Sequence, residues 1–363
     1  MTNLPAATSS AGMRLGLVTM SDDSKGSPAL RTYLAAAGLL LVGCVIGFIV
    51  RDRMNGKQKH PYTALREPGW EYVNPLLDCE QARNILQDDE LRPIEQSIED
   101  FIKHRLNRSW AREVTVYYRE LNDGPWFAIG NTEKFRPASL LKVPLMISVL
   151  KQAETDPALL RKKVRFDDRE IAALPNPVTK ALQFGRTYTV EELLEQMIVY
   201  SDNIATYLLD NVVDLDILRQ TYRDLGLPNP YSRLSSPPVV VAASDYMISA
   251  YDYAAFFRIL YNASYLSKQM SDKALRLLTK TDFKTGLIAG VPPHIKVAHK
   301  WGAHLSGPNN EIKQLHDCGI VYYPEHPYLL CIMTSGSSLE YLDDAIGAVS
   351  RAVYENIDKQ HHR

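Results

Sequence analysis

The sequence predicts a mixed α/β domain of the α+β type, in which an antiparallel five-stranded sheet is flanked by helices and holds an inserted helical subdomain. Three observations predict this fold: a hairpin pattern near the start, a long run of helical patterns after it, and three strand patterns with a closing helix at the end. Strands from both ends then share one sheet, and the helices between them form a subdomain. We expect one N-terminal transmembrane helix to precede this domain.

Composition divides the chain into four segments. The first is rich in Ser, Thr, Ala and Gly without apolar periodicity, and the third carries scattered Pro, Gly and charge. We predict a disordered tail (1–31), a transmembrane helix (32–50), a linker or stalk (51–88) and a globular domain (89–363).

The predicted transmembrane segment is an uncharged run of 19 residues between Arg31 and Arg51. At about 1.5 Å rise per residue it reaches roughly across a hydrocarbon core, so we expect residues 32–50 to contact membrane lipid. Two alternatives remain open: a cleaved signal peptide, and a lipoprotein cleavage box at residues 41–44. Both would still direct the chain into export. Taken alone, the excess of Lys and Arg after the run would place the domain in the cytoplasm.

Hydrophobic periodicity assigns the elements of the domain in order. Apolar residues recur at helical steps over 91–106, and the two strands 114–121 and 126–130 flank Asn122-Asp123-Gly124, a strong hairpin signal. Helical patterns then cover 139–152, 190–210 and 251–262. The domain ends with strands over 295–301, 318–323 and 328–334 and a helix over 339–357.

Charge and composition restrict the partners. A net charge of −1 and a pI near 6.8 provide no basic field, so we expect no nucleic-acid partner and a small substrate instead. The nine His and four Cys form neither Cys-x-x-Cys nor His-Glu-x-x-His, so the sequence predicts no metal and no cofactor. Cys318 and Cys331 flank a turn and can be neighbours on paired strands, but cross-strand geometry often prevents bridging. We expect free buried thiols.

The strongest chemical signal is a serine followed by a lysine one helical turn later. Ser139 and Lys142 share one helix face and lie within reach of each other. The lysine can act as a base only when neutral, which requires burial or a neighbouring positive charge. Ser148 and Lys151 repeat the spacing, but Ser148 lies nine residues on, on the opposite face of the same helix and away from its N-terminus. We therefore expect a structural role for Ser148.

The order and spacing of two further motifs along the sequence distinguish Ser139 from Ser148 as the candidate nucleophile. Ser201, in a Ser-Asp-Asn sequence, follows 62 residues later, and Lys300, in Lys-Trp-Gly, follows 99 residues after that. From about residue 90 onward, this set resembles class A β-lactamases and penicillin-binding proteins, which combine Ser-x-x-Lys, Ser-Asp-Asn and Lys-Thr-Gly. The segments 288–292 and 332–336 resemble class A as well.

A literal Lys284-Thr285-Gly286 also exists, but no strand pattern precedes it. Residues 295–300 begin with alternating apolar and polar residues, as a strand does, and can carry Lys300 toward a cleft. We therefore prefer Lys300 as the third motif.

The resemblance implies a β-lactamase-like fold and a role for each motif residue. Ser139 would be acylated, Ser201 would pass a proton to the leaving nitrogen, and Asn203 would orient the substrate amide and Lys142. Lys300 would supply positive potential, and the backbone N–H groups of Ser139 and Ala303 would form the oxyanion hole. The implied catalytic residues are Ser139, Lys142 and Ser201, and the implied substrate-binding residues are Asn203, Lys300, Trp301, Gly302 and Ala303.

The chain departs from the family pattern at two places. Class A enzymes release the acyl group with a glutamate between the second and third motifs, but no Glu occurs from Gln196 to Asn310. Asp245 is the only carboxylate of the matching region 227–245, and we expect it to brace that loop. Trp301 replaces a hydroxyl residue, which removes a hydrogen bond to the substrate carboxylate and adds an aromatic wall. Three nearby histidines are expected to form structural hydrogen bonds: His299, His304 and His316.

We therefore expect a membrane-anchored active-site-serine hydrolase, acylated by β-lactam or D-Ala-D-Ala type amides, with β-lactamase or D,D-peptidase activity. The missing glutamate favours the peptidase, whose substrate would be a peptidoglycan peptide. Because peptidoglycan lies outside the membrane, we expect a single-pass membrane protein with an extracytoplasmic catalytic domain, against the charge rule. The alternative is a catalytically impaired penicillin-recognising scaffold, although a binding module does not need both Ser139 and Lys142.

Overall fold

The structure is a computed structural model that describes residues 33, 36–47, 65–78, 91–104, 106, 111–122, 124–230 and 246–361. The chain divides into two compact units, Met1–Pro61 and Tyr62–Arg363. The predicted tail (1–31), much of the predicted linker and Asp245 lie outside the described residues.

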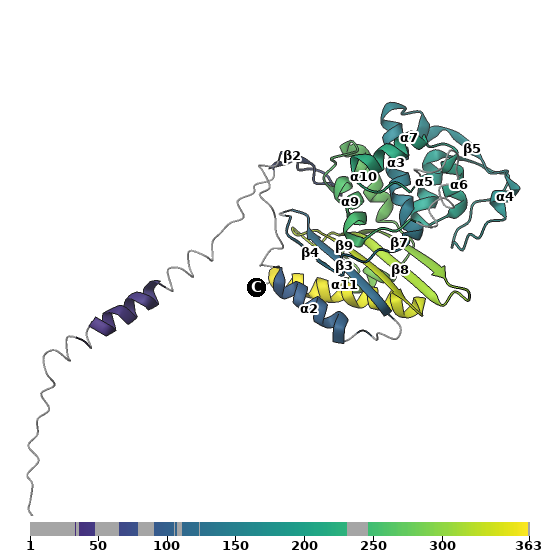
Figure 1. Cartoon of the computed structure of the whole chain (residues 1–363). Coiled ribbons are helices and arrows are strands. Elements are labelled where there is room, and N and C mark those ends of the chain that lie inside the picture. The colour runs from purple at the N-terminus through teal and green to yellow at the C-terminus, as the bar shows by residue number, and fades with distance from the viewer. Residues whose placement is uncertain are drawn as a thin grey trace, which may run out of the picture. The chain divides into compact units, whose positions relative to one another are not determined.

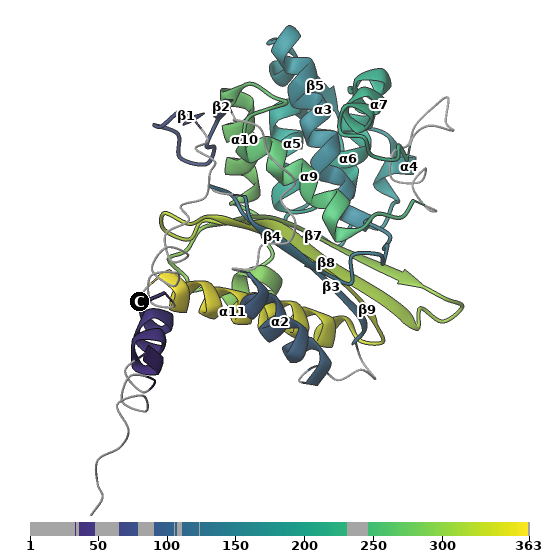
Figure 2. The same cartoon turned by 60° about the vertical axis from the view of Figure 1, so that its left-hand side comes forward.

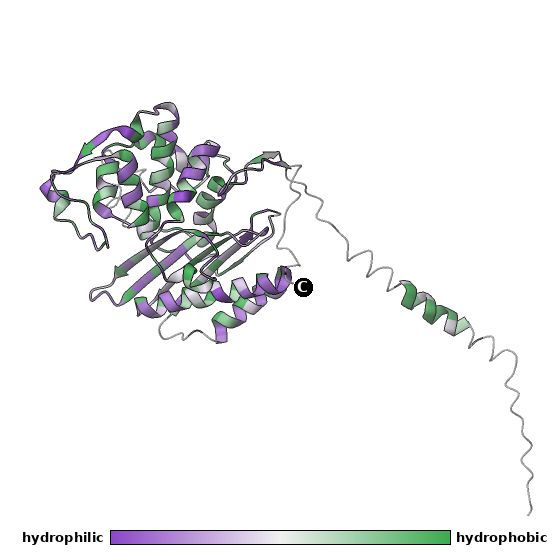
Figure 3. Ribbon diagram, turned by 180° about the vertical axis from the view of Figure 1, so that it is seen from behind, coloured by the Kyte–Doolittle hydropathy of each residue, from purple (hydrophilic) through white to green (hydrophobic). Residues whose placement is uncertain are grey.

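Residues 36–47, within the predicted transmembrane segment, form a helix that is largely apolar (Figure 3). None of the described helices is both long and apolar enough to cross a bilayer. Apart from Tyr33, the remaining residues of the segment 32–50 lie outside the described part of the chain.

Five antiparallel strands form the central sheet in the order β4-β3-β9-β8-β7 (Figure 1). Their bounds are β3 Ala111–Glu120, β4 Trp126–Ile129, β7 Val297–Ser306, β8 Ile312–Val321 and β9 Tyr328–Gly336. The first strand of the sheet in sequence pairs with the last, because β3 and β9 are in register from Val114↔Thr334 to Glu120↔Tyr328. This arrangement confirms the predicted five-stranded sheet that holds both ends of the domain.

Helices cover both faces of the sheet (Figure 2). On one face lie α2 (Arg92–His104) and α11 (Leu339–His361). The other face carries the inserted helical subdomain, with α3 (Lys142–Thr155), α4 (Arg169–Ala172), α5 (Val190–Val199), α6 (Asn203–Asp210), α7 (Leu215–Asp224), α9 (Ala250–Tyr261) and α10 (Lys268–Leu278). Short elements complete the subdomain: β5 (Lys163–Arg165), β6 (Thr187–Thr189) and the 3-10 turn η2 (Leu159–Arg161). The 3-10 turn η1 (Ala138–Leu141) leads into α3, and η3 (Gly286–Gly290) packs against α11 on the opposite face of the sheet.

Alternation along the strands creates two hydrophobic cores. In β3, Tyr117 belongs to the core on the side of the helical subdomain, whereas Val116 and Tyr118 belong to the core under α2 and α11. The same period of two appears in β9, where Met333 faces the subdomain and Ile332 faces α11. A strand buried on both faces reads as a continuous apolar run, as residues 328–333 do.

One predicted helix is interrupted where the second motif lies. The pattern over 190–210 predicts one helix, but the chain breaks at residues 200–202 into α5 and α6. Ser201 has a φ of +59°, which a continuing α-helix excludes, and Asp202 caps α6 by accepting a hydrogen bond from Ala205 N. Ser201 therefore lies in the short connection between two helices and not within a helix.

The expectation of free thiols at Cys318 and Cys331 is wrong, because the two form a disulfide. They lie directly opposite each other in β8 and β9, with their Cα atoms 3.9 Å apart. The sequence places both residues beside a turn but does not state the register that makes them partners. Both side chains are fully buried in the core on the subdomain side.

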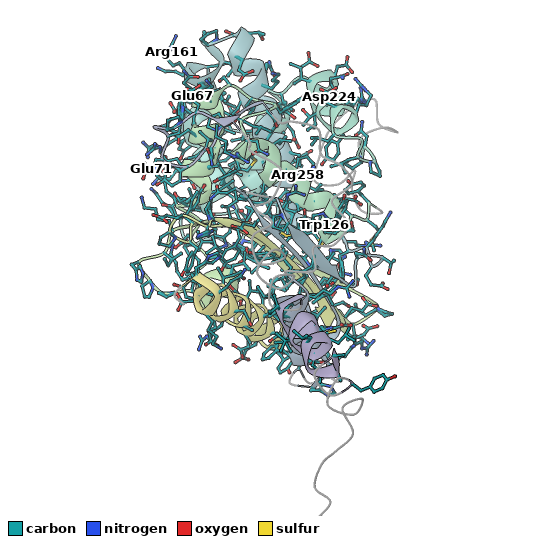
Figure 4. The ribbon with its side chains drawn as sticks, turned by 90° about the vertical axis from the view of Figure 1, so that its left-hand side faces the viewer. Glu67, Glu71, Trp126, Arg161, Asp224 and Arg258 are labelled. Carbon is teal, nitrogen blue, oxygen red and sulfur yellow. A yellow bond between two sulfur atoms is a disulfide. The ribbon has the colours of Figure 1, made fainter. Side chains whose placement is uncertain are left out.

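Residues 65–78, inside the segment predicted as a linker, contact the domain. They form the short strands β1 (Leu65–Arg66) and β2 (Leu76–Asp78), and Asn74 N donates to Tyr261 O over 2.8 Å. Glu67 and Glu71 lie along one flank of the molecule (Figure 4), where Glu67 pairs with Lys268 and Glu71 with Arg276. The second compact unit therefore includes residues before position 89.

Candidate active site

Ser139 lies in η1, the 3-10 turn that leads into α3. Ala138 before it has a φ of +49°, an uncommon conformation for a residue with a side chain. A hydrogen bond from α9 holds the turn, since the buried Tyr253 hydroxyl donates to Leu140 O over 2.9 Å. The hydrogen bond to Leu140 O therefore fixes the backbone next to Ser139, one helical turn before Lys142.

Lys142 begins α3, and its amine is surrounded by motif residues. Nζ lies 3.1 Å from Ser139 Oγ, and it donates to Ser201 O over 2.5 Å and to Asn203 Oδ1 over 2.8 Å. The side chain is only 3% exposed, because α3 runs through the interior of the subdomain. Burial lowers the pKa of Lys142 to about 7, although the charge of Asp202 opposes the shift. Near neutral pH the amine can therefore exchange a proton with Ser139.

The break between α5 and α6 positions the second motif. Asn203 donates from Nδ2 to Pro175 O over 2.9 Å, and its backbone N donates to Asn176 Oδ1 over 2.8 Å. Asn176 also donates to Asp202 Oδ1 over 3.1 Å. These bonds fix the amide of Asn203 so that its oxygen points at Lys142. Sequence reasoning missed Pro175 and Asn176, since they belong to an irregular loop without a motif.

Lys300, and not Lys284, reaches the serines. Lys300 lies in the edge strand β7, is fully buried, and donates to Ser201 Oγ over 2.9 Å. Burial and the neighbouring charge of Lys142 hold its pKa well below the ordinary value, and Asp317 opposes the shift. Lys284 instead donates to Thr281 O over 2.8 Å, just before η3. The structure therefore brings Lys300, and not Lys284, into contact with a residue of the second motif.

The three motifs form one continuous hydrogen-bonded chain. It runs from Ser139 Oγ to Lys142 Nζ (3.1 Å), on to Ser201 Oγ (3.2 Å), and on to Lys300 Nζ (2.9 Å). Residues far apart in sequence thus join two hydroxyls and two amines in a relay along which protons can move.

Gly302 allows β7 to approach the turn that carries Ser139. A Cβ atom at this position would lie 2.8 Å from Pro137 O and 3.1 Å from the backbone nitrogens of Ser139 and Leu140. Only a glycine fits this gap without displacing the turn. The close approach places the edge strand β7 directly beside the turn that carries Ser139.

Trp301 was expected to form an aromatic wall of the substrate site, but its ring makes other contacts as well. Its half-buried ring packs against the core under α2 and α11 and stacks on Phe283, with ring centroids 4.6 Å apart. Lys300 Nζ lies 5.3 Å from the ring centroid, so the indole supports the ammonium through a cation–π contact. The ring is therefore a support for Lys300 as well as a neighbour of the site.

The histidines near β7 have different surroundings. His299 pairs with the buried carboxylate of Asp317, with Nδ1 2.8 Å from Oδ1, and His316 Nε2 lies 3.1 Å from Arg136 O. These contacts confirm structural hydrogen bonds for His299 and His316. His304 differs, because its buried Nε2 has no hydrogen-bond partner among the described residues. Asp317, like Pro175 and Asn176, is a residue whose role the sequence did not reveal.

Ser148 lies in the interior of α3, away from the relay. Its hydroxyl donates to Pro144 O over 2.9 Å and lies 3.2 Å from Thr221 Oγ1 of α7. The side chain is fully buried and joins two helices. Its contacts agree with the structural role expected for the second Ser-x-x-Lys.

Comparison with solved structures finds the same fold. PBP-A shares 23% identity with this chain, covers 74% of this chain and 97% of its own length, and superimposes with a TM-score of 0.61. A beta-lactamase from Chitinophaga pinensis shares 21% identity over 73% of this chain and 100% of its own length, also with a TM-score of 0.61. A class A beta-lactamase from Bacteroides cellulosilyticus shares 20% identity over 73% and 97%, with the same TM-score of 0.61. At these identities the likeness shows the fold.

Sequence comparison gives the family. A search of curated proteins finds no match to the chain. The model of the beta-lactamase enzyme family, by contrast, matches residues 93–357, which include the turn of Ser139, the α5–α6 break and β7. The chain therefore belongs to the beta-lactamase enzyme family.

Proposed function

We propose that the protein is an active-site-serine hydrolase in which Ser139 is acylated by amides of the β-lactam or D-Ala-D-Ala type. The single observation that carries this proposal is the relay from Ser139 Oγ through Lys142 Nζ and Ser201 Oγ to Lys300 Nζ. A nucleophile needs a base within hydrogen-bond reach, and the relay supplies one whose pKa is about 7.

The acylation step follows from these contacts. Neutral Lys142 takes the proton of the Ser139 hydroxyl, and Oγ attacks the carbonyl carbon, with the oxyanion held by the backbone N–H groups of Ser139 and Ala303. When the C–N bond breaks, Ser201 gives its proton to the leaving nitrogen and regains one from Lys142. The step ends with the acyl group on Ser139 and a neutral Lys142.

Lys300 has two functions in this scheme. Its amine contacts Ser201 Oγ and so favours loss of the Ser201 proton to the leaving nitrogen. Its charge, when protonated, attracts the carboxylate that both substrate classes carry. Burial and the charge of Lys142 lower the pKa of Lys300, whereas Asp317 and the indole of Trp301 favour its charged form.

Slow deacylation is the second part of the proposal. No Glu occurs between Gln196 and Asn310, and Asp245 lies outside the described residues. Without a glutamate to activate water, the penicilloyl enzyme should persist, as expected of a D,D-peptidase that penicillin traps. A mutant of PBP-A, which shares 22% identity with this chain, has been solved as an acyl-enzyme complex with penicillin G.

We place the catalytic domain outside the cytoplasm, anchored by residues 32–50. The buried Cys318–Cys331 disulfide supports this location, because disulfides persist in oxidising compartments and are rare in the cytosol. A peptidoglycan-peptide substrate would be found in the same compartment.

Labelling with a fluorescent penicillin tests the proposal. The full chain in detergent, its Ser139→Ala variant and its Ser148→Ala variant are incubated with the reagent, and the adduct mass is followed over time. We expect a lasting adduct on wild type and Ser148→Ala and none on Ser139→Ala. Rapid turnover would refute slow deacylation, and labelling of Ser139→Ala would refute the nucleophile. No adduct and no turnover would favour a scaffold.

A further inference from the structure

Two histidines and a glutamate meet at one end of the sheet, outside the proposed active site. Glu120 is the last residue of β3, His326 lies in the turn between β8 and β9, and His361 is the last residue of α11. One ligand atom from each of the three side chains lies within 4.8 Å of the other two. The three residues come from distant parts of the chain, so no spacing motif could predict this cluster.

The contacts within the cluster bring ligand atoms close together. His326 Nδ1 lies 3.0 Å from Glu120 Oε1, and the His326 and His361 rings stack with centroids 3.5 Å apart and planes 19° from parallel. The side chain of Glu120 is 13% exposed and that of His326 is 32% exposed. The carboxylate is therefore largely shielded, while one side of the cluster remains open to solvent.

Neighbouring residues hold the cluster in shape. Asn122 Nδ2 donates to Glu325 O over 2.5 Å, which fixes the turn that carries His326. Tyr323 donates from its hydroxyl to Asp358 Oδ1 over 3.0 Å, which ties the end of α11 to the end of β8. These hydrogen bonds tie together the backbone segments that carry His326 and His361. Because the two rings are stacked, one imidazole must rotate out of the stack before both can bind the same ion.

The residue types fit one class of ligand. Two imidazoles and one carboxylate form a donor set that zinc and similar divalent transition ions use, with a fourth position left to water. Ligand atoms about 2.1 Å from a tetrahedral ion lie roughly 3.4 Å from one another. In the cluster, His326 Nδ1 and Glu120 Oε1 are 3.0 Å apart, and one ligand atom of each side chain lies within 4.8 Å of the others. We propose that Glu120, His326 and His361 bind a divalent transition-metal ion of the zinc class.

Such an ion would link the end of α11 to the β8–β9 turn and to the end of β3. An ion that binds only the folded chain stabilises it by mass action, so its effect should appear as a higher melting temperature. The proposal does not depend on the proposed hydrolase activity, because none of the three residues belongs to the relay.

Zinc titration of the full chain in detergent tests the proposal. The protein is treated with a chelator, dialysed, and titrated with Zn²⁺ in a calorimeter at neutral pH, where the imidazoles are available as ligands. We expect one equivalent to bind, and His326→Asn and His361→Asn each to weaken binding at least about tenfold. His294→Asn, which removes an exposed histidine before β7, should leave the affinity unchanged.

A second measurement separates loss of a ligand from loss of the fold. The melting temperature of wild type should rise with added Zn²⁺, whereas the two variants should melt like metal-free wild type and respond little to zinc. A variant that is less stable without metal is replaced by Glu120→Gln, which keeps the size of the side chain. The proposal fails if wild type binds no zinc, if both histidine variants keep full affinity, or if His294→Asn loses as much.

Discussion

The rate of Ser139 acylation should depend on the protonation of Lys142. Burial lowers the pKa of Lys142 from 10.5 to about 7, so the neutral amine becomes the major form above that pH. Each pH unit below this value reduces the neutral fraction about tenfold, so the rate at about pH 5 should be roughly 100-fold below the plateau at about pH 9. In the same way, the folded chain binds fewer protons than the unfolded chain between about 7 and 10.5, so this group makes the free energy of unfolding rise with pH in that window.

Asp202→Asn provides the matched perturbation. The charge of Asp202 raises the pKa of Lys142, so removing it should move the acid limb of the profile to lower pH. An asparagine can still accept the hydrogen bond from Ala205 N that caps α6, because Asn and Asp cap helices equally well. Asp202 Oδ2 has no hydrogen-bond partner among the described residues, which leaves that position for the amide nitrogen.

Stopped-flow labelling with a fluorescent penicillin measures both effects. The acylation rate constant is recorded from about pH 5 to 9 for wild type and Asp202→Asn, with the melting temperature of each as a control for folding. A profile that is flat through neutral pH, or an acid limb that moves upward in the variant, would show that Lys142 is not the base.

Three further predictions concern the surroundings of the relay. Gly302→Ala introduces a Cβ atom 2.8 Å from Pro137 O, so it should slow acylation about 10- to 100-fold by displacing Ser139. An acylation rate of the folded variant equal to that of wild type would contradict this prediction. Urea unfolding of Ser148→Ala should show a loss of about 1–2 kcal/mol with unchanged labelling, and a large loss of labelling would contradict its structural role. Replacing Cys318 and Cys331 together by alanine should lower the free energy of unfolding by about 2–4 kcal/mol in denaturant titrations, and an unchanged midpoint would show that the disulfide contributes nothing.

The sequence predicted the sheet because its signals are local. The hairpin around Asn122 and the continuous apolar run of β9 follow from turn chemistry and from burial on both faces. The extent of β7 and β8 was missed, since polar residues such as His304 and Gln314 interrupt the apolar pattern where the two strands still pair. The sequence also does not determine the register of β8 against β9, which is why the disulfide between Cys318 and Cys331 was not expected.

The motif residues of the site could be named from their order, but their supports could not. Asn176 and Asp317 act through hydrogen bonds to Asn203 and His299, and such contacts appear only when the loop and the strands are folded. The low pKa of Lys142 likewise depends on the burial of α3, a tertiary property that the spacing of Ser139 and Lys142 does not contain.

The distribution of buried charge explains why one lysine can change its protonation state. Both Lys142 and Lys300 contact Ser201 Oγ, and the charge of Lys142 lowers the pKa of Lys300. Each amine has its own buried carboxylate that favours the charged form: Asp202 for Lys142 and Asp317 for Lys300. Burial opposes both carboxylates, and for Lys142 the balance lies at a pKa of about 7. A base poised near the working pH accepts a proton from serine and returns it to the leaving group at similar cost. The folding of α3 and β7 around Ser201 therefore brings together the groups that the proposed acylation requires.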